Sequence, residues 1–261
     1  MSFPEVLANA TPIDGGFRVT VPSDWHQGRT AYGGISTALA LTAAMRAGGA
    51  DLPPLRSAQL SMIAPLYGEV EAQARVLRQG KNATWVSAEI TGEQGLGLAA
   101  NFVFMGPVES TLTIHGLVPP SDLIPVEDAA EFKFHEHSPI FLKTHFEVRH
   151  GLPRRTEKRP EICWWVRARE RSGLDPMVEL LLVADATPPG AGPLMAPSVP
   201  VSTMQWQVNL LTPLPQTRDG WWLLRSTGDH AERGCTSQDE TIWNADGEAM
   251  LAGMQSIALF G

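Results

Sequence analysis

The sequence of 261 residues has few charged side chains, few cysteines and no long apolar run. Charged residues make up 18% and hydrophobic residues 43% of the chain, so it can bury a sizeable core and does not have the composition of a disordered protein. Its two cysteines, Cys163 and Cys235, are far apart and have no Cys or His neighbours at ligand spacing. Neither a disulfide framework nor a zinc site is indicated, and we expect two reduced thiols.

Membrane insertion and nucleic-acid binding are disfavoured on similar grounds. No apolar run approaches the ~18 residues needed to cross a bilayer, and the opening segment 1–16 has neither the basic nor the apolar region of an export signal. The 28 acidic residues outnumber the 20 basic ones, and the net charge of -8 opposes binding to phosphate backbones. We therefore expect a cytoplasmic protein with no nucleic-acid partner.

Motifs that identify several other enzyme classes are missing as well. There is no Gly-Lys-Ser/Thr phosphate loop, no Gly-x-Gly-x-x-Gly fingerprint and no Gly-x-Ser-x-Gly nucleophile elbow. The histidines of the middle region do not have the spacing of a metal site, so we expect no metal; they are His135, His137, His145 and His150. The basic run 154–159 is typical of a solvated loop, with contact to the phosphates of a nucleotide-bearing substrate as the alternative.

Helix and strand patterns follow one another in the first half. The segment from Ala31 to Met45 is rich in Ala and Leu, has small residues nearly all round and is bracketed by glycines, which predicts a buried central helix. Apolar and polar residues then alternate, and this predicts strands at 55–64, 68–78, 82–92 and 97–105. The region from 106 to about 140 shows no sustained period and is predicted to be a surface connection.

The second half repeats this order. Asp175 suits an N-cap and Pro176 a first helical position, and the apolar run from Met177 to Ala186 predicts a second helix. Strands are again predicted behind it, at 201–211, 221–227, 235–243 and 249–260. Three alternating polar residues followed by a proline occur at 57–65 and, 148 positions later, at 205–213. Two copies of one helix-plus-sheet unit are the simplest explanation.

The repeat predicts the fold. One apolar helix and four or five antiparallel strands bury each other best when the sheet wraps around the helix, which is the hotdog arrangement. A single unit leaves open sheet edges, and two copies in one chain can pair these edges into a continuous sheet. We therefore expect an α+β double hotdog, with units at 1–106 and 140–261 and a connecting segment at 107–139.

Two features at helix ends each have two interpretations. Gly33 and Gly34 precede the first helix, where free backbone N–H groups either stabilise an oxyanion or merely accompany a tight turn and close packing. Asp185 ends the second helix, where the helix dipole disfavours a carboxylate by a few tenths to ~1 kcal/mol. It either acts as a general base partly removed from water or reaches solvent and caps the following turn.

Two strand residues are informative to different degrees. Gln255 lies in the last predicted strand on an apolar face shared with Ile257 and Leu259, where a carboxamide without partners costs ~1–3 kcal/mol. A functional role is favoured for this residue. Thr203 alternates with Gln205 and by pattern alone is an ordinary residue of the solvated face.

The order of these features resembles the double-hotdog acyl-CoA thioesterases related to bacterial acyl-CoA thioesterase II, over about residues 15 to 260. The matching motifs are Phe146-Glu147-Val148-Arg149, Trp165-Val166-Arg167-Ala168, Tyr32-Gly33-Gly34, Trp222-Leu223-Leu224 and Asp246-Gly247. That family holds its hydrolytic water with an Asp, a Thr and a Gln, and the matching positions are Asp185, Thr203 and Gln255. The chain departs from many relatives at Met204-Gln205-Trp206, where they have Ile-Asp-His, and at Ser256-Ile257, where they have Glu-Gly.

The resemblance implies hydrolysis of an acyl-CoA thioester without a metal or cofactor. Asp185 would accept the proton of a water held by Thr203 and Gln255, and the N–H of Gly34, together with Gly33, would stabilise the oxyanion. Tyr32 is the aromatic residue at this substrate-binding entry. Open sheet edges favour a homo-oligomer. Two alternatives stay open: an acyl-CoA-binding protein without activity, and an enoyl-CoA hydratase, which the absence of an Asp-x-Asn/His-Pro-x-His stretch disfavours.

Overall fold

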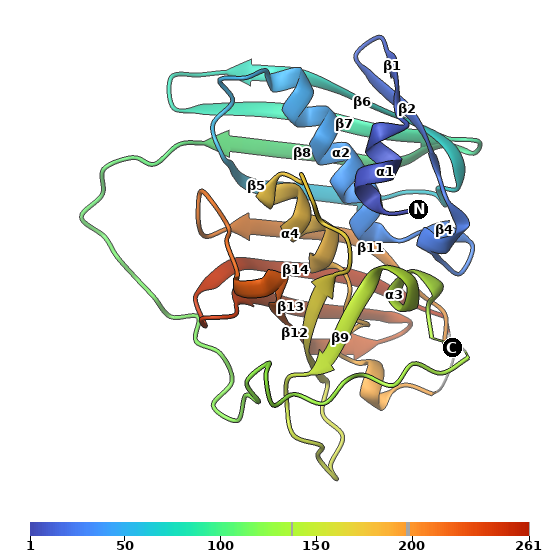
Figure 1. The fold of residues 1–261 in the computed structure, drawn as a ribbon, viewed down its shortest axis with the longest axis vertical. Helices are drawn as coiled ribbons and strands as arrows, with labels where there is room; N and C mark the ends of the chain where they lie inside the picture. The colour runs from blue at the N-terminus through green and yellow to red at the C-terminus, as the bar shows by residue number, and fades with distance from the viewer. Residues whose placement is uncertain (137, 197–198, 261) are drawn as a thin grey trace.

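The computed structural model describes residues 1–136, 138–196 and 199–260. Within this part of the chain, 12 strands form one continuous antiparallel sheet, and a helix from each half packs against it (Figure 1). The first half contains α1 (Phe3–Ala8), β1 (Thr11–Ile13), β2 (Gly16–Val21), β3 (His26–Gln27), β4 (Thr30–Ala31), α2 (Gly33–Gly48), β5 (Leu55–Met62), β6 (Gly68–Gln79), β7 (Ala83–Gly92) and β8 (Gly95–Met105). The second half contains α3 (Ile140–His145), β9 (Phe146–His150), β10 (Glu161–Ala168), α4 (Pro176–Ala184), β11 (Val201–Leu210), β12 (Trp222–Glu232), β13 (Cys235–Asn244) and β14 (Ala249–Leu259).

Both predicted helices and all eight predicted strands are confirmed. The Asp175 side chain caps α4 by accepting hydrogen bonds from the N–H groups of Met177 (2.8 Å) and Val178 (3.4 Å), as its position suggested. The largest boundary difference is in β12, which continues to Glu232. No pattern in the sequence had predicted α1, β1 or β2.

The strand order makes the repeat visible. Across the sheet, the first half has the order β1-β2-β6-β7-β8-β5, and the second half continues with β11-β14-β13-β12-β10-β9. Counted outward from the junction between β5 and β11, the two halves place their corresponding strands in the same order. The halves join where β5 pairs with β11, with Gln59 opposite Gln207. The polar residues that revealed the repeat therefore face each other across the junction, and the double hotdog is confirmed.

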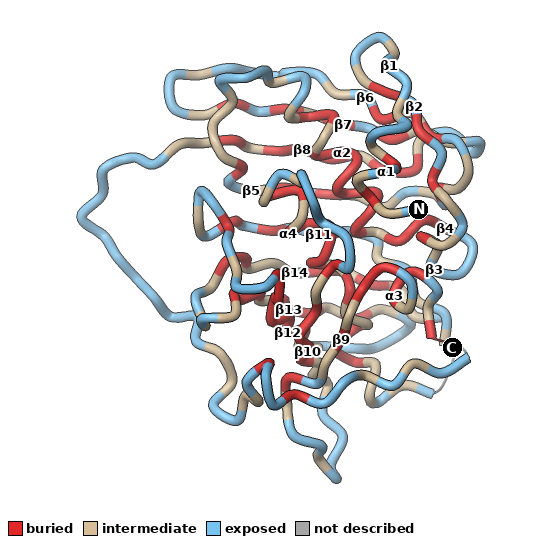
Figure 2. Tube along the Cα trace, in the orientation of Figure 1, coloured by how far each residue is buried: buried red, intermediate tan, exposed pale blue. Residues whose placement is uncertain are grey.

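The core lies between the sheet and the helices α2 and α4, which contact each other (Figure 2). The small side chains of α2 let it pack closely, and ten of its residues are buried. The Tyr32 hydroxyl, at the start of α2, donates a hydrogen bond to the Leu182 carbonyl of α4 (3.0 Å). A side chain at Gly34 would clash with the same carbonyl oxygen at 2.5 Å. This contact fixes the start of one helix against the end of the other.

The segment between β8 and α3 runs along the outside of the molecule (Figure 1). Its later part covers the opposite face of the second half's sheet, where the indole N–H of Trp165 donates to the Ile124 carbonyl (2.8 Å) and that of Trp243 to the Leu117 carbonyl (3.1 Å). Cys163 is buried on this face, in a hydrophobic cluster with Trp165 and Trp243. Both cysteines are free thiols, as predicted.

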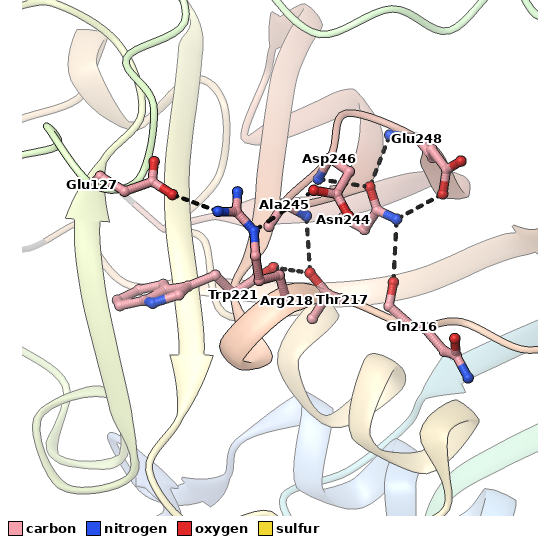
Figure 3. A network of polar contacts seen from close by, with 9 residues as sticks. All are labelled: Glu127, Gln216, Thr217, Arg218, Trp221, Asn244, Ala245, Asp246 and Glu248. Carbon is pink, nitrogen blue, oxygen red and sulfur yellow. Dashed lines mark hydrogen bonds and ion pairs between the residues drawn. The ribbon is translucent and has the colours of Figure 1, made fainter.

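A polar network holds the turn between β13 and β14 (Figure 3). The Asn244 side chain accepts from the N–H groups of Asp246 (3.0 Å) and Glu248 (2.9 Å), and Gly247 takes a positive φ of 83° that favours glycine. Arg218 contacts Glu127 of the connecting segment at 2.9 Å. The Asp246-Gly247 motif therefore belongs to a structural turn. No helix in the described ranges is long and apolar enough to cross a membrane.

Candidate active site

Asp185 lies at the meeting point of the two helices. It is the C-cap of α4, and its half-buried carboxyl accepts a hydrogen bond from the backbone N–H of Gly34 in the first turn of α2. A Cβ atom on Gly33 would lie 2.4 Å from Asp185 Oδ2, so only glycine leaves room for the carboxylate here. The positive end of the α2 dipole thus compensates the negative end of α4, which by itself disfavours a carboxylate.

Gln255 of β14 supplies the second donor to this carboxyl. Its Nε2 donates to Asp185 Oδ1 at 2.8 Å, and its Oε1 accepts from Gln238 Nε2 of β13 at 2.7 Å. Gln255 is 5% exposed, so both bonds are formed largely away from water. The partners that a carboxamide on an apolar face requires are therefore present.

Thr203 reaches the same place because β11 contains a bulge. Thr203 lies opposite Ile257 of β14, but the next pair is Gln205 with Ser256, so Met204 is an extra residue. Met204 and Gln205 are both exposed, and Thr203 faces inward with Ile257. Simple alternation, which placed Thr203 on the solvated face, was wrong because it assumed a regular strand.

A cavity of about 180 Å³ brings these residues together. Gly33, Asp185, Thr203 and Gln255 all line it, although they come from α2, the end of α4, β11 and β14. Other lining residues are Gln27, Thr30, Ala31, Ser36, Met62, Ile63, Ala64, Pro65, Leu66, Gly97, Thr187, Pro189, Val201, Ser202 and Ile257. The wall combines a carboxylate, a hydroxyl and an amide with an apolar surface.

Burial dominates the electrostatics of the site. It raises the pKa of Asp185 from 3.8 to about 7, although the hydrogen bonds from Gln255 and Gly34 act in the opposite direction. Glu240 of β13 is 2% exposed, and burial together with the Asp185 charge raises its pKa well above the usual range. Its Oε2 accepts from the indole N–H of Trp206 at 2.8 Å. A carboxyl whose pKa is about 7 can exchange a proton at neutral pH.

Gly34 and Tyr32 are not among the described cavity-lining residues and lie behind the cavity. The Gly34 N–H contacts Asp185, while the Tyr32 hydroxyl contacts Leu182 and its ring stacks on Phe141 with centroids 4.0 Å apart. Tyr32 is fully buried. In the structure, Tyr32 fastens α2 to α4, and Gly33 is the residue of this motif that reaches the cavity.

The buried polar groups behind the cavity wall include three that no single sequence pattern indicates. They are the Gly190 N–H, which donates to Gln238 Oε1 at 2.8 Å, and the side chains of Gln238 and Glu240. The repeat contained a signal for them. Gln238 and Glu240 lie 152 positions after Val86 and Ala88, which are buried apolar residues of β7. A comparison of the two copies thus finds polar residues in the second half where the first half has apolar ones, and this difference points to the second half as the one with more site residues.

The histidines of the middle region and the basic run 154–159 were the candidates for a metal site and a phosphate contact. His137 lies outside the described residues, and within the described ranges no group of three or more His, Cys, Asp or Glu side chains is placed to hold a metal ion. His145 stacks on Trp25 with centroids 3.8 Å apart. Arg155 of the basic run contacts Asp122 at 2.6 Å and Glu161 at 2.7 Å.

The chain matches two family models in consecutive order. The model described as acyl-CoA thioesterase N-terminal domain matches residues 21–105, and the model described as acyl-CoA thioesterase C-terminal domain matches residues 120–259. A search of curated proteins finds no significant match.

Solved structures resemble the chain over nearly its whole length. A conserved protein of unknown function with a hotdog fold from Alicyclobacillus acidocaldarius has a TM-score of 0.85 and 17% identity, covering 99% of this chain and 98% of its own. A thioesterase II described as putative, from Thermobifida fusca, has a TM-score of 0.81 and 19% identity over 98% and 97%. An acyl-CoA thioesterase II from Mycobacterium marinum has a TM-score of 0.76 and 15% identity over 99% and 98%. These similarities establish the fold.

Proposed function

This chain belongs to the acyl-CoA thioesterase family, and from that premise we propose that it hydrolyses acyl-CoA thioesters to a carboxylic acid and CoA by direct attack of water. One observation carries the proposal. The carboxyl of Asp185, half-buried and accepting a hydrogen bond from Gln255, opens onto a cavity that Thr203 and Gly33 also line.

In the proposed reaction, Asp185 is the general base. It takes a proton from a water held by the Thr203 hydroxyl and by the second N–H of the Gln255 amide, and the water oxygen bonds to the thioester carbonyl carbon. The negative charge moves to the carbonyl oxygen, where the backbone N–H of Gly33 at the positive end of α2 stabilises it. The C–S bond then breaks, the carbonyl re-forms, and Asp185 returns its proton to the leaving sulfur.

The two backbone N–H groups at the start of α2 have different roles in this proposal. The Gly34 N–H hydrogen-bonds to Asp185 and favours the ionised base, so the oxyanion is assigned to Gly33, which borders the cavity. The acyl group is assigned to the apolar part of the wall, which includes Met62 and Leu66. We expect its chain to continue beside α2, between the two units.

The departures from the family pattern support a retained activity more than a role in binding alone. Gln205, where many relatives have an acid, is exposed on the outer face of β11. Trp206, where they have a histidine, is buried with its indole N–H bonded to Glu240. Neither change removes a group from the set formed by Asp185, Thr203 and Gln255.

The test is free-thiol release from a panel of acyl-CoAs from acetyl to palmitoyl, with the Asp185→Asn protein assayed in parallel. Loss of a positioned base lowers turnover by ~10²–10⁴-fold, so we expect turnover on at least one thioester that the variant nearly abolishes. A variant that keeps more than half of the activity would refute the assignment of the base. Tight binding of one acyl-CoA without thiol release would replace the proposal with the binding protein.

Location and assembly belong to the same proposal. Acyl-CoA is the expected partner, and we expect the protein to act in the cytoplasm as a homo-oligomer, because β1 leaves one outer edge of the sheet available, whereas residues 130–132 pair with β9 at the other edge. Light scattering on the purified protein would give the number of chains per particle, and a monomer would contradict the expected assembly.

A further inference from the structure

We propose that Gln238 is a positioning residue for the hydrolysis proposed above: through a one-way series of hydrogen bonds that begins at the Gly190 N–H, it fixes which end of the Gln255 carboxamide faces Asp185. The three bonds are 2.8 Å from Gly190 N to Gln238 Oε1, 2.7 Å from Gln238 Nε2 to Gln255 Oε1, and 2.8 Å from Gln255 Nε2 to Asp185 Oδ1.

The direction of this series follows from its first member. A backbone N–H can only donate, so Gln238 must present its oxygen to Gly190 and its nitrogen to Gln255. Gln255 must then accept with its oxygen, which leaves its nitrogen for Asp185. The carboxyl of Asp185 therefore meets a donor, and a donor favours the ionised form that a general base needs.

The local backbone holds the first member in place. A Cβ atom on Gly190 would lie 2.5 Å from the nitrogen of Gly228, so this loop approaches β12 more closely than any other residue allows. Pro188 and Pro189 precede it and restrict the chain further. The donor at Gly190 is thus fixed by packing and does not depend on the two glutamines.

The register places the glutamines side by side. Gln238 of β13 lies directly opposite Gln255 of β14, and the two are 1% and 5% exposed. Their equivalents in the first half, Val86 and Phe102, form the same pair between β7 and β8 and are buried apolar residues. An apolar pair is therefore compatible with the architecture. A buried polar pair is costly unless every group has a partner, and here the partner of the last group is the adjacent carboxyl of Asp185.

Two titratable groups share charge interactions with Asp185 from the elements packed around it. They are Glu240 on β13 and Tyr32 at the start of α2, and burial raises the pKa of both above their usual values. Asp185 has a pKa of about 7, so we expect the pH response of the site near neutrality to follow Asp185 and the hydrogen bonds that end on it.

The first variant is Gln238→Met, which keeps the side-chain length and removes both hydrogen bonds. Thr236→Val is the matched control, because Thr236 is buried on the same face of β13 and its hydroxyl bonds to the His230 carbonyl, away from the site. We expect kcat to fall about tenfold in Gln238→Met with KM within twofold of wild type, since the bonds orient Gln255 and do not hold the acyl chain. The control should keep kcat within twofold. A Gln238→Met protein with kcat within twofold of wild type would overturn the proposal.

The second variant, Gln238→Glu, separates positioning from general support of the fold. A neutral Glu can accept from Gly190 and donate its O–H to Gln255, so it preserves the series at low pH. Once ionised, it can only accept, and the Gln255 amide must turn its oxygen toward Asp185. We expect kcat near wild type at low pH and a new loss of at least tenfold as the pH rises. A pH profile parallel to that of wild type over pH 5–9 would contradict the proposal.

One readout does not depend on turnover. The side-chain amide signal of Gln255 in ¹⁵N NMR should follow the ionisation of Asp185 in the wild type, and the amplitude of this response should at least halve in Gln238→Met. An unchanged amplitude would overturn the positioning role even if the enzyme hydrolyses thioesters. If no acyl-CoA is hydrolysed, the proposed function fails, and this measurement still decides the role of Gln238.

Discussion

At the scale of single residues, the site is built around a carboxyl group whose charge is only marginally stable. Two donors, Gly34 and Gln255, favour the ionised form of Asp185, and burial disfavours it more strongly, so that its pKa is raised to about 7. A carboxylate with the usual pKa would be a weaker base, and one with a much higher pKa would be protonated at neutral pH. The balance between burial and these two donors thus suits proton transfer near pH 7.

The first prediction is a pH dependence of kcat/KM, which reports the ionisation of the free enzyme. Because Asp185 must be unprotonated to act as base, kcat/KM should rise by about tenfold per pH unit below about pH 7 and level off above it. Steady-state rates between pH 5 and 9 at constant ionic strength measure this. A flat profile, or an acid limb near pH 4, would show that burial does not control this carboxyl.

The same pKa predicts a pH dependence of stability. Asp185 has a pKa of about 7 in the folded protein against 3.8 for the unperturbed group, so the folded state binds more protons between these values and loses stability as pH rises. The loss should amount to at most roughly 1.4 kcal/mol per pH unit. Urea unfolding of wild type and Asp185→Asn at pH 4, 5.5, 7 and 8.5 should show the variant gaining relative stability up to about pH 7, then a constant difference. A difference independent of pH would contradict this.

At the scale of elements, the site depends on how two helix ends are joined. The last carbonyls of a helix have no partner within it, and the Leu182 carbonyl of α4 obtains one from the Tyr32 hydroxyl at the start of α2. The stacking of Tyr32 on Phe141 brings α3 into the same contact. Three helices are thereby held together beside Asp185.

Replacing Tyr32 by Phe tests this docking role. The substitution leaves the ring and removes a hydroxyl that serves a buried carbonyl, so we expect a loss of about 1–3 kcal/mol in the free energy of unfolding. Because Tyr32 does not line the cavity, KM should stay within twofold of wild type. Urea denaturation and steady-state kinetics together decide the point: an increase in KM without a loss of stability would instead assign Tyr32 to substrate binding.

The position of Thr203 shows where sequence patterns stop being sufficient. Alternation with Gln205 assigned it to the solvated face, and only the resemblance to the thioesterases selected it. A bulge leaves the alternation of polar and apolar residues in the sequence unchanged. It nevertheless exchanges the buried and solvated faces of the strand on one side of the extra residue. The first half has the same irregularity, since Leu55 lies opposite Phe104 and Ser57 opposite Val103, with Arg56 as the extra residue.

The inward orientation of Thr203 has a direct test. Thr203→Val keeps the shape of the side chain and removes the hydroxyl that the proposal assigns to the water, so kcat should fall about tenfold with KM little changed. Met204→Ala is the matched control, because Met204 is the extra residue of the bulge and its side chain is exposed. The kcat of this variant should stay within twofold of wild type. Equal effects of the two substitutions would argue against a role for the hydroxyl.

At the scale of the whole molecule, the repeat made the fold predictable. Eight strands and two helices followed from periodicity, because each unit must bury one apolar helix against alternating strands. α1 and β1 are too short, at 6 and 3 residues, to show a period. Gln238 and Glu240 could not be predicted for a different reason: polar residues at alternate positions are typical of a solvated strand face, and only their tertiary contacts, with Gly190 and Trp206, accompany their burial.

The two halves contribute unequally to one site. Gly33 comes from the first unit and Asp185, Thr203 and Gln255 from the second, so neither unit contains the set alone. The units are joined by the β5–β11 pairing and by the contact of α2 with α4, and both joints lie beside the cavity. The connecting segment takes no part in either joint.

This arrangement predicts that cutting the connection leaves the site intact. A protease site inserted at 108–112, which is exposed and precedes the part that covers the second sheet face, should be cleaved without loss of the β5–β11 pairing. We expect the two fragments to elute together in size-exclusion chromatography and to keep thioesterase activity within twofold of the uncut protein. Because the cut removes the tether, unfolding in urea should become dependent on protein concentration. Fragments that separate in buffer would show that the tether, and not the paired strands and helices, holds the units in register.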